Sequence, residues 1–74
     1  MPNLSNSTIT IVGLGLIGGS IAKALKENAR AATLIGYDSD QEALELALAE
    51  QIVDRSGDLE ECLEAADLVI LALP

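Results

Sequence analysis

The stretch IVGLGLIGGS, residues 11–20, decides the fold, because it places four glycines in ten positions directly behind a β-branched hydrophobic run. Glycine is costly inside regular structure because it gives up the most backbone freedom on folding. The run that precedes it, residues 8–12, is β-branched at every position. This favours a strand, and its lack of polar alternation predicts burial of both faces. The glycines therefore mark a corner at the end of a buried strand.

Beyond this corner the sequence alternates helices and strands. Residues 17–28 repeat apolar side chains at four-residue spacing, which indicates an amphipathic helix, and residues 32–37 form a second apolar strand. Residues 39–42, SDQE, match the capping box and predict a helix with Ser39 as its N-cap. A short third strand is expected at residues 51–54.

The last third of the chain repeats this logic. Residues 58–61, DLEE, predict a helix with Asp58 as its N-cap, and residues 67–74 form a strongly apolar final strand. The helix is expected to present one apolar face, formed by Leu59, Cys62, Leu63 and Ala66. Strands that alternate with helices in this order predict an α/β fold with right-handed crossovers and a parallel sheet.

Composition excludes several classes of partner. The 74 residues make at most one small domain, and their 50% apolar content, nearly all aliphatic, suits a buried parallel sheet. Twelve acidic and four basic residues give a net charge of −8, which argues against nucleic acid or an anionic membrane. No apolar run approaches the ~20 residues of a membrane span, and the first residues lack the apolar core of a signal peptide. With Cys62 as the single cysteine, we expect a soluble, cytoplasmic chain.

The residue types of the chain give little indication of a catalytic site or a metal site. The chain has no histidine, which excludes a histidine-based acid–base pair or metal site within it. Cys62 is interpreted as a small buried hydrophobic residue rather than a nucleophile. A helix cap and a solvated face explain the acids Asp58, Glu60, Glu61, Glu64 and Asp67. An exposed helix face explains the bases Lys23, Lys26 and Arg30. We expect no catalytic residue and no metal ligand.

The glycines form the pattern G-x-G-x-x-G between a strand and a helix. In that context Gly13 permits the tight turn, Gly15 lets a pyrophosphate approach the backbone, and Gly18 lets helix and strand pack closely. The amides and positive dipole at the start of the helix would attract phosphates. A P-loop is excluded because no G-K-[ST] follows. We expect a dinucleotide to bind at Gly13, Leu14, Gly15, Leu16, Ile17 and Gly18. The alternative is that the glycines serve tight packing in another α/β protein.

A second signal for a dinucleotide is Asp38, which stands at the end of the second strand, twenty positions beyond Gly18. An acid there accepts hydrogen bonds from the adenosine ribose hydroxyls of NAD. Residues 37–42, YDSDQE, add two more acids and no base, so a 2′-phosphate would be repelled and NAD is predicted over NADP. The alternative for Asp38 is a solvated or helix-capping acid. Gly19 is expected to make a packing contact, while Ser20 is either a phosphate donor or an ordinary helix serine.

Similarity to a known family is carried by three stretches: IVGLGLIGGSIAKALK (11–26), IGYDSDQEALELALAEQIVD (35–54) and DLEECLEAADLVILALP (58–74). Together they resemble the start of the prephenate/arogenate dehydrogenase family of tyrosine biosynthesis, from residue 8 onward. The resemblance implies a partial Rossmann-type three-layer fold at residues 8–74, with a parallel sheet and helices on both faces. The polar residues 1–7 are expected to form a disordered lead. About the first half of a dinucleotide-binding domain would be present.

The resemblance also implies an activity for the parent enzyme: oxidative decarboxylation of prephenate or arogenate with NAD(P)+. The segment Ala72–Pro74, with Leu73 and Pro74 as binding residues, would approach the nicotinamide-side ribose, although the family more often has Thr where this chain has Leu73. The catalytic histidine and the helical dimerisation and substrate domain of the family lie further along, so we expect a homodimeric full-length enzyme and an inactive 74-residue fragment. Another Rossmann dehydrogenase, of 2-hydroxyacid or β-hydroxyacid type, and a non-catalytic dinucleotide-sensing module remain alternatives.

Overall fold

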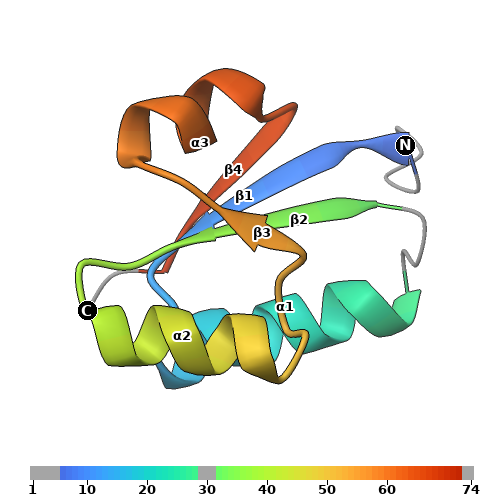
Figure 1. Ribbon diagram of the computed structural model, residues 1–74. Coiled ribbons are helices and arrows are strands. Elements are labelled where there is room, and N and C mark those ends of the chain that lie inside the picture. The colour runs from blue at the N-terminus through green and yellow to red at the C-terminus, as the bar shows by residue number, and fades with distance from the viewer. Residues whose placement is uncertain (1–5, 29–31, 73–74) are drawn as a thin grey trace.

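Parallel strands flanked by helices build the part of the chain that the computed structural model describes, residues 6–28 and 32–72. In chain order the elements are β1 (Thr8–Val12), α1 (Leu16–Asn28), β2 (Thr33–Tyr37), α2 (Gln41–Ala49), β3 (Arg55–Ser56), α3 (Leu59–Ala65) and β4 (Leu68–Leu71). The strands form one sheet in the order β3-β2-β1-β4, and every pairing is parallel. Helices α1 and α2 cover one face and α3 covers the other (Figure 1). This confirms the predicted three-layer α/β fold.

Strand β1 lies at the centre of the sheet and is buried on both faces. Ile9 and Ile11 are fully buried in the main core, which also holds Leu14, Ala22, Leu34, Ala47 and Val53. Thr10 is equally buried on the opposite face, where its hydroxyl donates a hydrogen bond of 2.6 Å to the carbonyl oxygen of Cys62 in α3. The β-branched run thus packs against both helical layers, as its sequence predicts.

The register of the sheet brings three strand ends together. Val12 is paired with Tyr37 of β2 and with Leu71 of β4. Beyond the strands, the Gly13 amide donates to the Tyr37 carbonyl and the Ala72 amide donates to the Val12 carbonyl, each at 2.8 Å. The segments that follow β1, β2 and β4 therefore leave the sheet side by side, at the carboxyl ends of these strands.

The third strand lies later in the chain than predicted. The prediction of a strand at residues 51–54 is wrong, because β3 comprises Arg55 and Ser56. The residues before it close helix α2: Gln51 adopts a left-handed backbone with φ of 58°, and the Ile52 amide donates to the Ala47 carbonyl at 2.8 Å. Val53 lies in the core and Ile52 packs against it, so these two apolar residues anchor the turn and do not mark a strand.

The cap of helix α2 is also displaced from its predicted position. Asp40, not Ser39, is the N-cap: its carboxylate accepts a hydrogen bond of 3.0 Å from the amide of Glu42. The capping-box prediction failed because two cap-forming residues stand close together and Asp40 directly precedes the helix. The predicted cap of α3 is confirmed, since Asp58 accepts from the amide of Glu61 at 2.9 Å.

Two further aspartates tie loops to strands at the amino ends of β1 and β2. Asp67 accepts a hydrogen bond from the Thr8 amide, and Asp54 accepts one from the Leu34 amide, each at 2.8 Å. Asp54 also forms an ion pair with Lys26 of α1. Burial opposes ionisation of Asp54, but the hydrogen bonds from Leu34 and Lys26 and the Lys26 charge outweigh it and lower the pKa of this carboxyl. The carboxylates therefore serve as links between segments.

The last helix and strand are more exposed than their apolar sequence suggests. Of the predicted apolar face of α3, Cys62 is buried, while Leu59 and Leu63 are 40% and 42% exposed. Ala66 is the C-cap in extended backbone and so lies outside the helix. Strand β4 forms an edge of the described sheet and is paired on one side by β1. The spacing of apolar residues predicted these two elements, but it did not predict how much of their surface stays exposed in the described chain.

Three predictions fall wholly or partly outside the described residues. The disordered lead at residues 1–7 is described from residue 6 on, where the Ser7 carbonyl accepts a hydrogen bond of 3.0 Å from the Thr33 amide. Arg30 of the predicted basic face and the final pair, Leu73 and Pro74, are among the residues not described. Within the described ranges, no helix is both long and apolar enough to cross a membrane.

Candidate functional site

A cleft of about 660 Å³ opens at the carboxyl ends of β1, β2 and β4, against the first turns of α1 and α2. Its walls are formed by Gly13, Gly15, Leu16, Ile17, Asp38, Ser39, Asp40, Ala43, Leu71 and Ala72. The volume falls in the range of small-molecule sites. The chain runs from β1 outward through β2 to β3, and then returns to place β4 on the other side of β1. The cleft thus lies at the point where strand order reverses, which is where open α/β sheets bind ligands.

Gly13 forms the corner between β1 and the cleft. Its φ of 102° lies in a region that side chains rarely adopt, and its amide donates to the Tyr37 carbonyl at 2.8 Å. The predicted role of Gly13 in a tight turn is therefore confirmed. The turn sends the chain from the centre of the sheet directly into helix α1.

Gly18 allows helix α1 to lie against that turn. A Cβ atom at this position would overlap the carbonyl oxygen of Gly13, far inside the 3.0 Å that real Cβ atoms keep, and would lie 2.9 Å from the Gly13 carbonyl carbon. Gly18 is buried and does not line the cleft. Its predicted role in close packing is confirmed, with the turn backbone as its neighbour.

Gly15 differs from both, because neither packing nor backbone conformation requires a glycine at this position. Beyond its two neighbours in the chain, a Cβ atom at Gly15 would meet no atom within 4 Å, and its backbone has no positive φ. Gly15 is exposed and lines the cleft. The absent side chain leaves bare backbone facing open space, which fits the close approach of a bulky anionic group.

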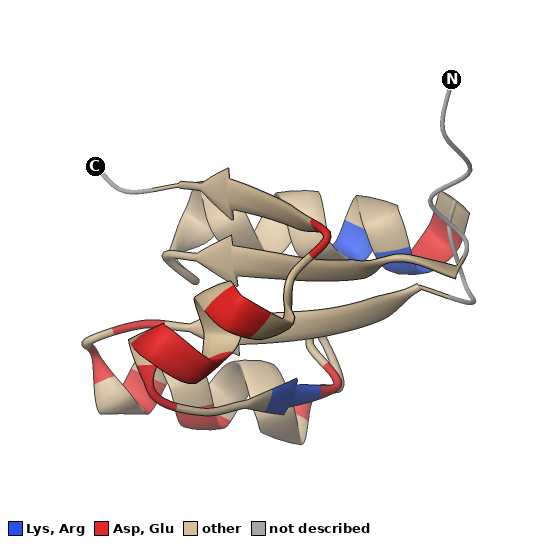
Figure 2. Ribbon diagram, turned by 90° about the horizontal axis from the view of Figure 1, so that it is seen from above, with Lys and Arg blue, Asp and Glu red and all other residues tan. Residues whose placement is uncertain are grey.

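The start of helix α1 supplies donors for such a group. Helices α2 and α3 begin with Asp40 and Asp58, whose carboxylates cap their own amides. Helix α1 instead follows Gly15 and has no acid in its first turn. The first amides of a helix lack acceptors inside it and carry the positive end of its dipole. Figure 2 shows acids spread over α2, α3 and their flanking turns, whereas the amino-terminal half of α1 carries no charged residue.

Asp38 faces this cleft from the end of β2. One carboxylate oxygen accepts a hydrogen bond of 2.7 Å from the Leu14 amide, and the other accepts one of 2.8 Å from the Asp40 amide. A carboxylate offers about four acceptor positions, so each oxygen retains capacity for a further donor. Asp38 is half-buried, which leaves it accessible to a ligand in the cleft.

The remaining predicted residues differ in where the structure places them. Leu16 and Ile17 line the cleft with 89% and 70% of their surface exposed, whereas Leu14 is 7% exposed and packs in the core. Leu73 and Pro74 lie outside the described residues. Gly19 makes only a distant packing contact, 4.0 Å from an added Cβ to the Leu14 carbonyl oxygen. The Ser20 hydroxyl donates to the Leu16 carbonyl at 2.8 Å, as an ordinary helix serine does.

Four wall residues were not predicted from the sequence: Ser39, Asp40, Ala43 and Leu71. A signal for Ser39, Asp40 and Leu71 was available, because the carboxyl ends of parallel strands meet at the same edge of a sheet. The turn after β2 and the end of the fourth strand therefore had to border the glycine turn. Leu71 could have been placed there once β4 was aligned with β1.

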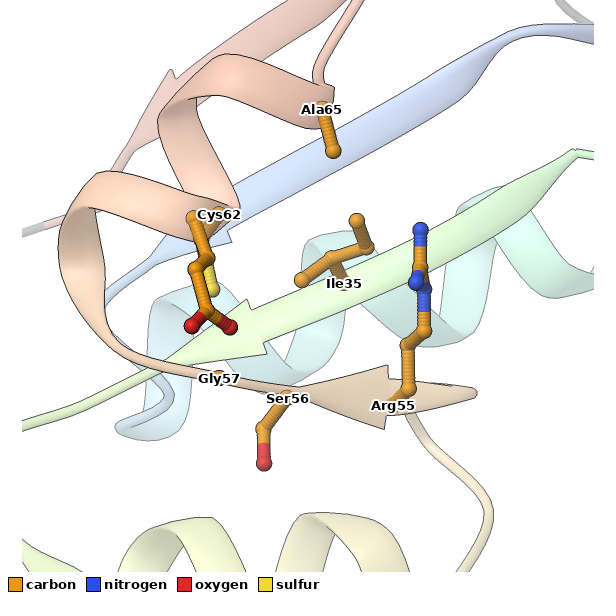
Figure 3. A pocket seen from close by; sticks show the side chains of 7 residues that line it. Ile35, Arg55, Ser56, Gly57, Cys62 and Ala65 are labelled. Carbon is orange, nitrogen blue, oxygen red and sulfur yellow. The ribbon is translucent and has the colours of Figure 1, made fainter.

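A second, smaller pocket lies on the opposite face of the sheet, between β3 and α3 (Figure 3). It has a volume of about 40 Å³ and includes Arg55, Ser56, Gly57 and Cys62. This is space for a few water molecules, not for a nucleotide. Burial raises the pKa of the Cys62 thiol, which fits its predicted role as a buried hydrophobic residue. Among the described residues, no three His, Cys, Asp or Glu side chains gather as metal ligands would.

The fold, the glycine turn and the cleft at the strand ends define a dinucleotide-binding domain of Rossmann type. Residues 1–74 match the family model described as "D-isomer specific 2-hydroxyacid dehydrogenase, NAD binding domain". The chain belongs to this family of NAD-binding domains, and it is similar to prephenate and arogenate dehydrogenases. By this membership the chain is an NAD-binding domain.

Individual relatives support this placement. The chain is 41% identical over 73 residues to a prephenate dehydrogenase of Bacillus subtilis, covering 97% of this chain and 20% of that protein. It superposes on prephenate dehydrogenase from A. aeolicus, solved with hydroxyphenyl propionate and NAD+, with a TM-score of 0.85 and 31% identity, covering 99% of this chain and 26% of the other. For arogenate dehydrogenase of Synechocystis the TM-score is 0.79 and the identity 39%, over 90% and 23%. The chain thus spans about a quarter or less of each relative.

Proposed function

We propose that this chain is the cofactor-binding part of a prephenate or arogenate dehydrogenase, and that the cleft beside Gly15 holds NAD. The observation that carries the proposal is the bare backbone at Gly15, which faces a cleft at the switch point of the sheet although nothing in the protein prevents a side chain there. The pyrophosphate would lie against Gly15 and the uncapped start of α1. The adenosine ribose would donate hydroxyl hydrogen bonds to Asp38.

The substrate is proposed from the relatives. In the whole protein, NAD+ would accept a hydride from prephenate or arogenate while the carboxylate leaves as CO2. The products would be 4-hydroxyphenylpyruvate or tyrosine, respectively, and NADH. Residues 1–74 contain no histidine to act as an acid or base, so we propose that they bind NAD without turning over the substrate. Leu73 and Pro74 would border the nicotinamide-side ribose in the complete site.

A 2-hydroxyacid dehydrogenase is the second candidate, because the matching family model carries that description. The sequence relatives and the superposition on prephenate dehydrogenase favour the first. Two further parts belong to the proposal. The full-length enzyme would be a homodimer, which the resemblance supports. It would lie in the cytoplasm, which the single buried thiol of Cys62 supports.

Cofactor preference tests the proposed site. The cleft presents Asp38 and Asp40 and no base among its walls. A 2′-phosphate on the adenosine ribose would meet carboxylates without a compensating cation, so NADH should bind at least about tenfold more tightly than NADPH. Titration followed by nicotinamide fluorescence measures both dissociation constants. Asp38→Ala should weaken NADH binding and reduce the ratio of the NADPH dissociation constant to the NADH dissociation constant. Equal affinity of the unmodified chain for the two cofactors would contradict the assignment.

A further inference from the structure

We propose that Asp38 is a positioning residue for the phosphate half of the site, because its carboxylate holds the glycine turn through the Leu14 amide. This rests on the proposed function and adds to it. An acid that only receives ribose hydroxyls would matter for the sugar alone. The hydrogen bond of 2.7 Å from Leu14 exists without any sugar and joins β2 to the turn that would face the pyrophosphate.

The bond continues the pairing of β1 and β2 beyond the ends of both strands. The Gly13 amide donates to the main-chain carbonyl of Tyr37, and the next amide, of Leu14, donates to the side chain of Asp38. Two consecutive peptide groups of the turn are thus held by two consecutive residues of the neighbouring segment. The direction of the peptide that leads into Gly15 is set by these anchors.

The Leu14 amide depends on this acceptor. The hydrogen bond is partly shielded from solvent, and the Leu14 side chain is 7% exposed, within the core. Without the carboxylate, the amide would lose its partner at a place where water replaces it poorly. The turn would then relax toward another acceptor, and Gly15 would move with it.

The orientation of the carboxylate is itself fixed. Its second oxygen accepts from the Asp40 amide at 2.8 Å, and Asp40 in turn caps helix α2. Because each oxygen keeps a free acceptor position, a ribose can bind while the link to Leu14 stays intact. One side chain would therefore serve the sugar directly and the phosphates through the backbone.

The test separates the two roles by using ligands with and without ribose hydroxyls. Dissociation constants are measured by calorimetry for ADP and for 2′,3′-dideoxy-ADP, which keeps the diphosphate and lacks the hydroxyls. Asp38→Ala removes a negative charge near the phosphates, so an acid acting only on the ribose would leave binding of the dideoxy ligand unchanged or strengthen it. A positioning role predicts instead that Asp38→Ala binds 2′,3′-dideoxy-ADP about fivefold or more weakly than the unmodified chain does.

Asp67→Ala is the matched control. Asp67 also accepts a strand amide, from Thr8 at 2.8 Å, and its loss changes the net charge equally, but it lies at the amino end of the sheet, away from the cleft. We expect it to leave both affinities within about twofold. If Asp38→Ala does not fold, Asp38→Asn is used, because its side chain has an NH2 donor in place of one of the two carboxylate oxygens, so one of the two amides would lose its acceptor.

A spectroscopic readout decides the question without ligand. In amide spectra of the free protein, Asp38→Ala should shift the Leu14 and Gly15 signals and accelerate hydrogen exchange at Leu14, while Asp67→Ala should not. Unchanged signals there, or dideoxy-ADP binding as tight as in the unmodified chain, would overturn the inference while leaving the cleft as the NAD site. Failure of the unmodified chain to bind either nucleotide would refute the proposed function, and the inference with it.

Discussion

Replacing Gly15 with valine is expected to abolish NAD binding while the fold stays intact. Apart from Gly15 and its two neighbours in the chain, no atom lies within 4 Å of a Cβ built at this position, and the backbone does not need a positive φ. The unfolding free energy should therefore change by less than about 1 kcal/mol. The added methyl groups would project into the cleft and block the approach of the pyrophosphate to the start of α1.

The loss of affinity for NADH should be at least about a hundredfold, and Gly15→Ala, with a single methyl group, should give a smaller loss. Fluorescence titration measures the affinity, and urea denaturation confirms that the variants fold. Gly19→Ala is the control, since Gly19 does not line the cleft. Binding of NADH to Gly15→Val at the affinity of the unmodified chain would show that the phosphates do not lie at this corner.

Replacing Gly18 with alanine is expected to unfold the chain or nearly so. The new methyl group would overlap the Gly13 carbonyl group, which is main chain and cannot rotate away. Helix α1 would have to move off the turn. Overpacking of this kind costs about 3 kcal/mol, a large share of the marginal stability of a small domain.

Gly19, the next residue in the chain, provides the control for Gly18→Ala. At Gly19 an added Cβ would approach the Leu14 carbonyl oxygen only to 4.0 Å. Gly19→Ala should therefore stabilise the chain by about 0.5–1 kcal/mol through helix propensity. Urea denaturation of the two variants gives both values. Equal stability of the two alanine variants would mean that α1 does not pack on the turn as described.

Local chemistry was sufficient to predict most of the fold. The β-branched residues of β1, the glycine turn and the Asp58 cap are determined by their immediate neighbours in sequence, and the structure confirms them. The choice between Ser39 and Asp40 as a cap, and the position of the third strand, depended on how the chain enters and leaves helix α2. Such details follow from tertiary packing, which local patterns do not encode.

The candidate site was predictable to a similar extent. The spacing of the glycines and the placement of Asp38 brought five predicted residues to one cleft: Gly13, Gly15, Leu16, Ile17 and Asp38. Leu71 joins them at the end of β4, as the parallel order of the strands indicates, whereas Ala43 joins them through the packing of α2, which sequence spacing alone does not give. The bond from the Leu14 amide to Asp38 depends on side-chain geometry across two strands, so it could only come from the structure.

The central claim is that NAD binds at the carboxyl ends of β1 and β2. Its most direct test is titration of the isotopically labelled chain with NAD, followed by amide spectra. We predict saturable shifts that are largest at Gly13, Gly15 and Asp38, with small changes at Arg55 and Cys62, which border the pocket on the other face. Saturable shifts centred on Cys62, or no saturable shifts at the glycine turn, would contradict it.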